Sequence, residues 1–155
     1  HLLVELGSVE FWKVAMKPAK PFAFGRLGET PFFGLPGNPV SVAVAFEQFL
    51  RPALLHMMGA TQLFRPRLVG ILEDAVHTDS RKEVFLRVTV RAGGDGALRA
   101  HLSGAQGSNI LTALAAADAF AVVPVGIAGL EAGSLVHLEM MRMPAARTAE
   151  EVFGA

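Results

Sequence analysis

The chain has 155 residues, of which 52% are apolar and 18% charged, and its net charge at pH 7 is zero. This composition excludes a disordered chain, and the neutral balance gives no electrostatic case for nucleic acid or an anionic membrane as a partner. The absence of cysteine excludes disulfide bonds, thiolate metal sites and a cysteine nucleophile. It also agrees with a reducing compartment, so we expect a cytoplasmic protein.

The start of the chain resembles the interior of a domain. His1 and the residues after it lack the basic region and the apolar core of a signal peptide, so we expect a fragment of a longer protein. No stretch of about 18 apolar residues lacks a charge or a turn signal, which predicts no membrane span. The sequence has no Gly-x-Gly-x-x-Gly run, no Walker loop and no His-Glu-x-x-His motif, and its five histidines are scattered without metal-ligand spacing.

The first elements are short. Residues 9–16 predict one strand, and the prolines in residues 17–21 predict a rigid, extended loop after it. Residues 25–29 favour a turn. The apolar run Phe32–Leu35 predicts a buried parallel strand that leads into a helix.

The clearest local signal is this helix. Asn38 suits the N-cap and Pro39 the first helical position, where a missing N–H has no cost. We expect the helix to continue to about Met58, with a kink at Pro52 and a stop at Gly59. Its broad apolar surface indicates that a sheet, and a partner subunit, cover it.

The composition changes near Arg65, after which short strands and turns dominate. Residues 84–92 alternate, with Val84, Leu86 and Val88 on one face and Arg87 on the other. The predicted elements are strands over residues 67–76, 84–92, 97–102, 119–125 and 134–143, a glycine hairpin over 93–96 and a helix over 108–117. These patterns predict an α/β part over residues 1–64, a small β domain over 65–144 and a tail without a clear pattern over 145–155.

Three segments carry residues with chemical potential. The Pro36–Pro39 turn leads into a helix N-terminus, which is either a capped helix start without a ligand or an anion site. Lys13 and Lys17, on one face of a continuous strand, would lie roughly 13 Å apart at 3.3 Å per residue. They could bracket a polyanion or simply protect a strand edge. Arg87 is either a surface arginine or a site residue, and Ser108, at a predicted helix start, caps that helix or meets an anion.

Two long motifs resemble one enzyme family. The segment from Lys13 to Gly25, which reads KVAMKPAKPFAFG, is similar to the lysine-rich signature of the molybdopterin molybdenumtransferases and the gephyrin E domain. The run Phe32–Ser41, followed by residues 46–54, is similar to the next signature of that family. Residues 81–87 and 106–108 fall where the family has motifs of its C-terminal β domain.

The resemblance implies a fold and an activity. The fold is the C-terminal half of an α/β subdomain similar to molybdopterin adenylyltransferases, followed by a small β-barrel-like domain. Full-length members have four subdomains and form homodimers. They insert molybdate into adenylated molybdopterin, release AMP and yield molybdenum cofactor with a divalent cation, usually Mg²⁺. The molybdopterin adenylyltransferase is then the expected upstream partner, with no nucleic acid and no membrane involved.

The resemblance also implies roles for residues. Lys13 and Lys17 resemble the family's active-site lysines, whose charge suits molybdate or phosphate oxygens. Arg87 and Ser108 resemble β-domain residues that face the same cleft. The residues that resemble the cofactor-binding turn are Pro36, Gly37, Asn38, Pro39 and Ser41. Ala19 departs from the glycine of most relatives, and it would strain the loop if this position needs a positive φ. No metal ligand is expected in this chain.

Two other interpretations compete with the enzyme. In a gephyrin-like, non-catalytic scaffold or dimerisation module, exchanging Lys13 and Lys17 for alanine in the full-length protein would leave cofactor synthesis intact. A simple adenylyltransferase-like protein is disfavoured by the β domain after Arg65.

The family's acidic residues for Mg²⁺ and nucleotide are expected upstream of His1. We therefore expect this chain alone to release no AMP from adenylated molybdopterin, molybdate and Mg²⁺, and clear turnover would contradict that expectation.

Overall fold

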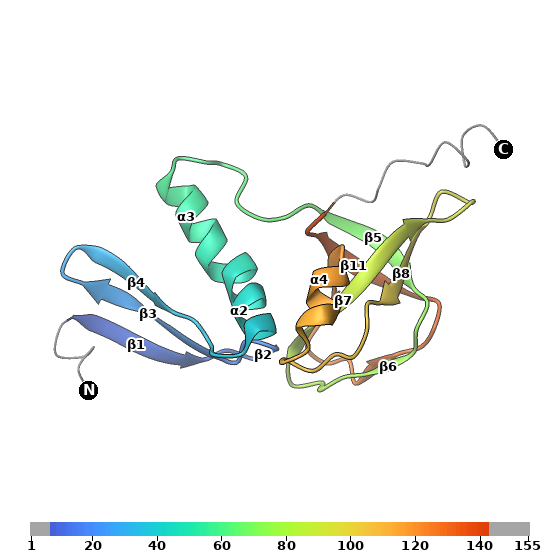
Figure 1. Cartoon of the computed structure of the whole chain (residues 1–155), viewed down its shortest axis with the longest axis horizontal. Helices are drawn as coiled ribbons and strands as arrows, with labels where there is room; N and C mark the ends of the chain where they lie inside the picture. Colours follow the sequence, from blue (N-terminus) through green and yellow to red (C-terminus); the bar gives the residue numbers. More distant parts are fainter. Residues whose placement is uncertain (1–6, 143–155) are drawn as a thin grey trace.

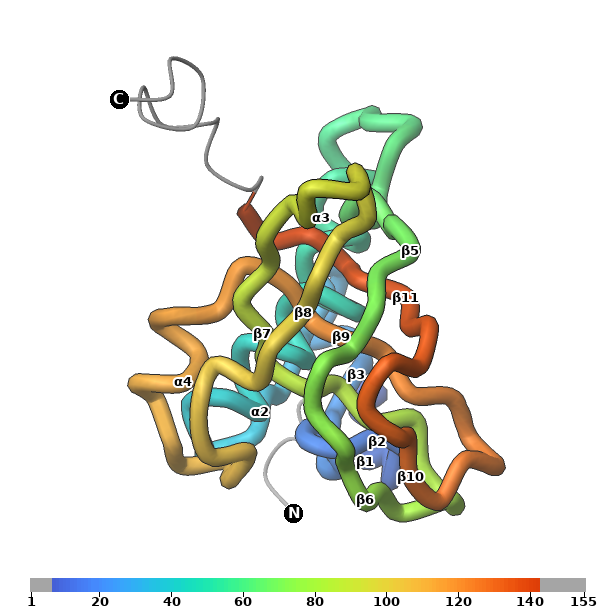
Figure 2. Tube along the Cα trace, turned by 90° about the vertical axis from the view of Figure 1, so that its right-hand side faces the viewer, coloured from blue at the N-terminus to red at the C-terminus, as the bar shows by residue number. Residues whose placement is uncertain are grey.

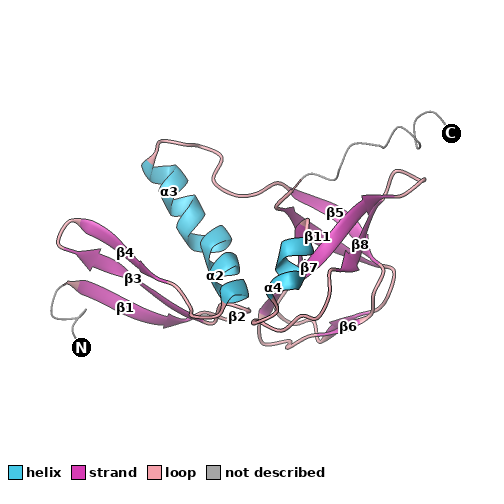
Figure 3. Cartoon of the chain, in the orientation of Figure 1, coloured by secondary structure: helices cyan, strands magenta, loops and turns pink. Residues whose placement is uncertain are grey.

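The computed structural model describes residues 7–142, as a small sheet, a helical rod and a barrel (Figure 1, Figure 3). The small sheet is antiparallel, with the order β1 (Ser8–Lys13), β3 (Pro21–Leu27) and β4 (Thr30–Gly34). The rod comprises α2 (Pro39–Ala45), the π-helical turn η1 (Phe46–Leu50) and α3 (Arg51–Met57). In Figure 1 the rod stands between the small sheet and the barrel.

The barrel is a closed five-stranded sheet (Figure 2). Its strands are β5 (Arg67–Leu72), β7 (Glu83–Ala92), β8 (Leu98–Leu102), β9 (Ala119–Val123) and β11 (Ser134–Met140). They follow the order β7-β8-β5-β11-β9, and β9 also pairs with β7, which closes the ring. Closure removes the free strand edges within the ring. The predicted fold class, an α/β part followed by a small β-barrel-like domain, is confirmed.

Four short elements complete the structure: β2 (Met16–Lys17), β6 (Val76–His77), β10 (Gly129–Leu130) and α4 (Leu111–Ala116). Strands β6 and β10 pair with each other, and β2 pairs in parallel with β7. A strand from the first part of the chain thus extends the barrel's sheet. The division at residues 64 and 65 stays a prediction, and the predicted tail at 145–155 lies outside the described residues.

Strand β7 separates two apolar cores because its side chains alternate. Its even-numbered residues from Val84 to Val90 are buried inside the barrel, as the sequence pattern predicts. Phe85, on the other face, packs edge-on against Phe120 of β9, with ring centroids 6.2 Å apart. These two rings and Val44 of α2 belong to a second core, which joins the rod to the barrel.

The predicted single strand over residues 9–16 is wrong. Strand β1 ends at Lys13, and the next N–H, of Val14, donates to the Lys20 carbonyl at 2.9 Å. The chain then crosses to the other sheet, where Lys17 lies opposite Val84 in β2. Lys13 and Lys17 therefore do not share one face of a strand, and the spacing of roughly 13 Å expected from an extended strand loses its basis. The proline-rich loop draws the chain back, and residue-by-residue alternation does not reveal such a turn.

The strand before the helix is antiparallel, not parallel as expected. Strand β4 pairs only with β3 among the described strands, and Gly28 at φ +61° forms the tight turn between them. Its side chains are half-buried or exposed. The apolar run Phe32–Leu35 thus forms a sheet edge, because its neighbours come from the adjacent hairpin.

The helix begins at Pro39 and ends where Gly59 adopts φ +83°, both as predicted. Asn38 occupies the N-cap position, but its side chain makes no capping hydrogen bond. The irregularity expected at Pro52 takes the form of the π-helical turn η1, which directly precedes α3. A proline lacks the N–H of a regular helix and crowds the turn before it, so a wider turn accommodates its ring.

Ala19 holds a backbone conformation that L-residues avoid. Its φ is +83°, and its side chain is 2% exposed in the second core. The strain that the sequence predicts for an alanine at this position is therefore present. A left-handed conformation costs an L-residue about 1–2 kcal/mol.

Ala19→Gly should change the free energy of unfolding by less than about 1 kcal/mol, because relief of the strain offsets the lost burial of one methyl group. Ala23→Gly is the matched control: Ala23 is also buried, but in the regular strand β3. This variant should lose about 1–2 kcal/mol. Urea denaturation of both variants measures the difference, and equal losses would contradict the strain at Ala19.

Candidate functional site

A cavity of about 770 Å³ lies between the first part of the chain and the barrel. The first part contributes β2, the loop after it and the start of α2, and the second part contributes β7, the segment around β6 and the loop before α4. The lining residues are Met16, Lys17, Pro18, Ala19, Lys20, Pro21, Asn38, Ser41, Ala75, Val76, His77, Lys82, Val84, Phe85, Leu86, Arg87, Leu102, Gln106, Gly107 and Ser108. A ligand in this cavity would contact both parts of the chain.

The cavity is strongly cationic. Three of the chain's four lysines line it, Lys17, Lys20 and Lys82, together with Arg87. None of the lining residues is an aspartate or a glutamate. A low-dielectric cleft lined by one sign of charge concentrates ligands of the opposite sign. The cavity is therefore suited to an anion.

Arg87 is the most unusual of these cations because it is buried. Its side chain is 1% exposed, and Nη2 donates to the carbonyl oxygens of Ala105 at 3.1 Å and Gly107 at 3.2 Å. Its Nε–H has no acceptor among the described residues. Burial lowers the pKa of the guanidinium from its ordinary value, but an arginine keeps its proton in proteins. Of the two interpretations from the sequence, the surface arginine is thus excluded.

Gln106 fixes the backbone of Arg87. Its Oε1 accepts from the Arg87 backbone N–H at 2.8 Å, and its Nε2 donates to the Arg87 carbonyl at 3.1 Å and to the Gly104 carbonyl at 2.7 Å. The Gln106 side chain thereby continues the hydrogen bonding of β7 beyond its last pair with β8, Val88 with Leu102. The loop that carries Ser108 is held against the strand that carries Arg87.

Two predicted residues that are 70 positions apart meet at the cavity. Asn38 Nδ2 donates to Ser108 Oγ at 3.3 Å, and the Val40 N–H donates to the Ser108 carbonyl at 3.3 Å. Ser41, one turn along α2, is buried and lines the same cavity. The expectation that Ser108 begins a helix is wrong, because α4 starts at Leu111 and Ser108 lies in the turn before it. Its hydroxyl bonds across to the rod instead of capping its own helix.

Four predicted site residues do not line this cavity. Lys13 ends β1, and Pro36, Gly37 and Pro39 flank the lining residue Asn38. The roles predicted for these four stay predictions. Five predicted residues do line the cavity: Lys17, Asn38, Ser41, Arg87 and Ser108.

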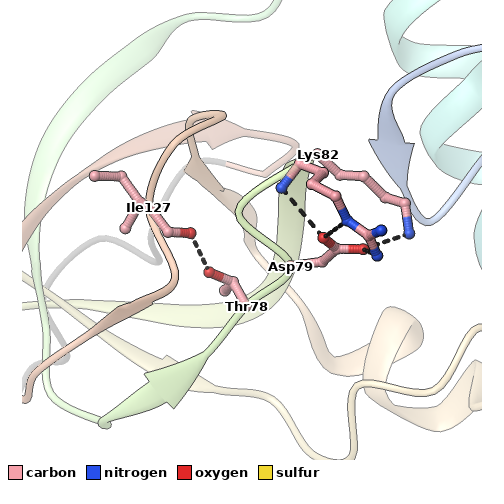
Figure 4. Close-up of polar contacts among 5 residues, drawn as sticks. Thr78, Asp79, Lys82 and Ile127 are labelled. Carbon is pink, nitrogen blue, oxygen red and sulfur yellow. Dashed lines mark hydrogen bonds and ion pairs between the residues drawn. The ribbon is translucent and has the colours of Figure 1, made fainter.

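Lys82 is a site residue that the sequence did not single out. It precedes β7 and its Nζ donates to Asp79 Oδ2 at 2.6 Å (Figure 4). Arg81 Nε donates to the other oxygen of Asp79 at 3.0 Å. Arg81 and then Lys82 hold the pKa of the Asp79 carboxyl well below its usual value, so it stays ionised. One carboxylate faces two cations, which leaves net positive charge at this rim of the cavity.

Lys20 was also missed, although both lysines lie in segments with a clear signal. Lys20 is one of four cations without an acid between Phe11 and Gly28, and Lys82 lies in the cationic segment before β7. Charge patterning could have found them, but it does not say which cations face a common cavity. Gln106 lies in the segment 106–108 that resembles a β-domain motif of the family, but no role was predicted for it, and His77 carries no local signal.

Within residues 7–142, no group of three or more histidine, aspartate or glutamate side chains is positioned to hold a metal ion. In the same part of the chain, no helix has both the length and the apolarity to cross a membrane.

Two parts of the sequence each match a known protein family. Residues 2–56 match the family described as a probable molybdopterin binding domain. Residues 69–140 match the one described as the MoeA C-terminal region, domain IV. The rod and the small sheet fall in the first match, and most of the barrel falls in the second.

Named relatives and solved structures agree with these matches. The molybdopterin molybdenumtransferase of Haemophilus influenzae is 34% identical over 143 residues, which cover 89% of this chain and 34% of that protein. Gephyrin of Dictyostelium discoideum is 32% identical over 158 residues, which cover 87% of this chain and 22% of that protein. A crystal structure of the molybdopterin biosynthesis MoeA protein of Pyrococcus horikoshii superposes with a TM-score of 0.75 at 28% identity. The superposition covers 92% of this chain and 34% of that protein. The chain thus spans about a third or less of these proteins.

Arg87→Met should bind anions poorly without losing stability. The variant loses two bonds to carbonyl oxygens but also removes an unpaired buried charge, so we expect the free energy of unfolding to stay within about 1 kcal/mol of wild type. Val88→Ala, at the next and equally buried position of β7, opens a cavity and should cost about 2 kcal/mol or more. Thermal unfolding at constant ionic strength, with and without sulfate, measures both effects. A larger decrease in the free energy of unfolding for Arg87→Met than for Val88→Ala would contradict the role of Arg87 as an unpaired cation.

Proposed function

The chain belongs to the family of molybdopterin molybdenumtransferases and gephyrin, and we propose that it forms the oxyanion-binding part of a molybdate insertion site. In this proposal the full-length protein inserts molybdate into adenylated molybdopterin and releases AMP. Molybdenum cofactor biosynthesis is the process that the names of the relatives support. The specific reaction, insertion of molybdate with release of AMP, is inferred from the chemistry of the cavity.

The observation that carries the proposal is the buried guanidinium of Arg87, whose Nε–H lacks an acceptor among the described residues and which lines an acid-free cationic cavity. Molybdate is a tetrahedral dianion whose four oxygens all accept hydrogen bonds. Arg87 and Lys17 can neutralise its two charges, and the hydroxyls of Ser41 and Ser108 can bond further oxygens. These donors come from separate segments of the chain, β2, α2, β7 and the turn before α4.

The remaining cations suit the second substrate. Adenylated molybdopterin carries a phosphoanhydride, and AMP leaves with negative charge on its phosphate. Lys20 and Lys82, on the same cavity, can stabilise that charge as it develops. A volume of about 770 Å³ exceeds what a single oxyanion needs, so the cavity has room for part of the organic substrate.

The expected Mg²⁺ does not fit the described residues, because they contain no group of three acidic or histidine side chains that could hold a metal. We assign no step to a metal ion in this chain. A homodimer, cooperation with a molybdopterin adenylyltransferase and a cytoplasmic location stay predictions for the full-length protein.

Molybdate should bind this chain, and Lys17→Met should weaken the binding roughly tenfold or more, as expected for loss of one charge-assisted contact. Arg91→Met is the matched control, since it removes one positive charge from an exposed residue of β7 that does not line the cavity. Isothermal titration at constant ionic strength, with sulfate as the competing anion, measures both variants.

The proposal fails if the wild-type chain binds no molybdate. It also fails if Arg91→Met weakens binding as much as Lys17→Met, because the effect would then reflect total charge and not this cavity.

A further inference from the structure

A ring of polar contacts connects the helical rod, the linker and the barrel. Gln48 Nε2 of η1 donates to Glu139 Oε2 of β11 at 2.5 Å, and Arg67 Nη2 at the start of β5 donates to the other oxygen of Glu139. Arg65, two residues earlier in the linker, makes a bidentate ion pair with Glu47. Its Nε donates to Oε2 and its Nη2 to Oε1, both at 2.9 Å. Glu47 and Gln48 are adjacent in η1, so the ring is closed through the backbone.

The members of this ring are more constrained than ordinary surface ion pairs. Glu139 is only 7% exposed, and a buried carboxylate is stable only with such partners. The bond to Glu47 raises the pKa of Arg65 above its ordinary value, which keeps this pair ionised. Between the two arginines, the Pro66 carbonyl accepts from the Met140 N–H at 3.0 Å. The linker is thus held from both sides.

The π-helical turn supplies the geometry of the ring. It holds one more residue than an α-helical turn, so it rotates the side chains after it relative to those before it. Within η1, Gln48 reaches the barrel, while the ring of Phe49 packs on Phe22 of β3 at a centroid distance of 4.8 Å. These two consecutive residues thereby join the rod to the barrel and to the small sheet.

The same rod forms one wall of the anion cavity. It carries Asn38 and Ser41, and the barrel carries Arg87 and Ser108. Near the cavity the rod meets the barrel through the Asn38 and Val40 bonds to Ser108, each 3.3 Å long, and through the apolar contacts of Val44 in the second core. Gln48 lies ten residues beyond Asn38, about 15 Å at 1.5 Å per residue. Beyond it α3 runs away from the barrel (Figure 1). The bonds to Ser108 hold the rod at one end, and the Gln48–Glu139 bond adds a polar contact further along it, which fixes its direction on the barrel.

We propose that Glu139 is a positioning residue that, through Gln48 and Arg67, holds the rod at one angle on the barrel. This angle keeps Asn38 and Ser41 at binding distance from Arg87 and Ser108. The inference rests on the proposed function for the identity of the ligand, while the fixed angle itself does not depend on it.

The test is a spin-label distance between the rod and the barrel. Because the chain has no cysteine, Met58→Cys and Glu131→Cys create the only two labelling sites. Met58 is 81% exposed at the far end of the rod, and Glu131 is exposed on the barrel. We expect one narrow distance distribution in the otherwise unchanged chain. Gln48→Ala and the isosteric Glu139→Gln should both broaden it, with folding checked by circular dichroism.

Asp95→Ala is the matched control, because it removes a carboxylate from an exposed pair with Arg99 in the β7–β8 hairpin, which points away from the rod (Figure 1). It should leave the distribution narrow. Molybdate affinity should fall roughly three- to tenfold in Gln48→Ala, because the rod then holds the binding angle for only a fraction of the time. Saturating molybdate should narrow the distribution of that variant again, because the ligand favours the angle that it binds.

An unchanged distribution in both Gln48→Ala and Glu139→Gln would overturn the inference. So would broadening without any change in molybdate affinity, because the angle would then not position the cavity. If the wild-type chain binds no molybdate, the proposed function fails, and the distance distributions alone still decide whether Glu139 fixes the rod.

Discussion

The site depends on a buried guanidinium that no carboxylate neutralises among the described residues. Arg87 faces away from the barrel core because its strand alternates, and the second core covers that face with Phe85 and Phe120. Backbone carbonyls satisfy part of its hydrogen-bonding capacity, but its Nε–H has no acceptor among the described residues. Uncompensated buried charge is costly in a protein without a ligand. We expect the fold to tolerate the buried charge of Arg87 because an anion in the cavity can neutralise it. The packing of the barrel and the chemistry of the cavity are connected in this way.

Local patterns predicted much of the fold. The alternation from Val84 to Val90, the glycine turn at residues 93–96 and the helix between Asn38 and Gly59 all reflect interactions within one element or one hairpin. The errors concern interactions between elements. The break after Lys13 depends on a return of the chain near Lys20, and the pairing of β4 depends on which strand lies beside it. Periodicity records which side of a strand is buried but does not identify its neighbour.

The candidate site was predictable to a similar extent. Resemblance to the family identified Lys17, Arg87 and Ser108, and the structure brings them to one cavity. It could not reveal that Arg87 is buried, because alternation gives the face of a strand and not what covers that face. Lys20 and Lys82 were missed for a related reason: their segments are visibly cationic, but only the folded chain brings them to a common cavity.

The most direct test of this account is X-ray diffraction at the molybdenum absorption edge from crystals of the chain soaked in molybdate. The account predicts one dominant anomalous peak within hydrogen-bonding distance of Arg87 Nε, between Lys17 and the Ser108 hydroxyl. The same soak with Arg87→Met should lack this peak. Anomalous peaks only at exposed surface cations, with the Arg87 Nε–H still without an acceptor, would contradict the account.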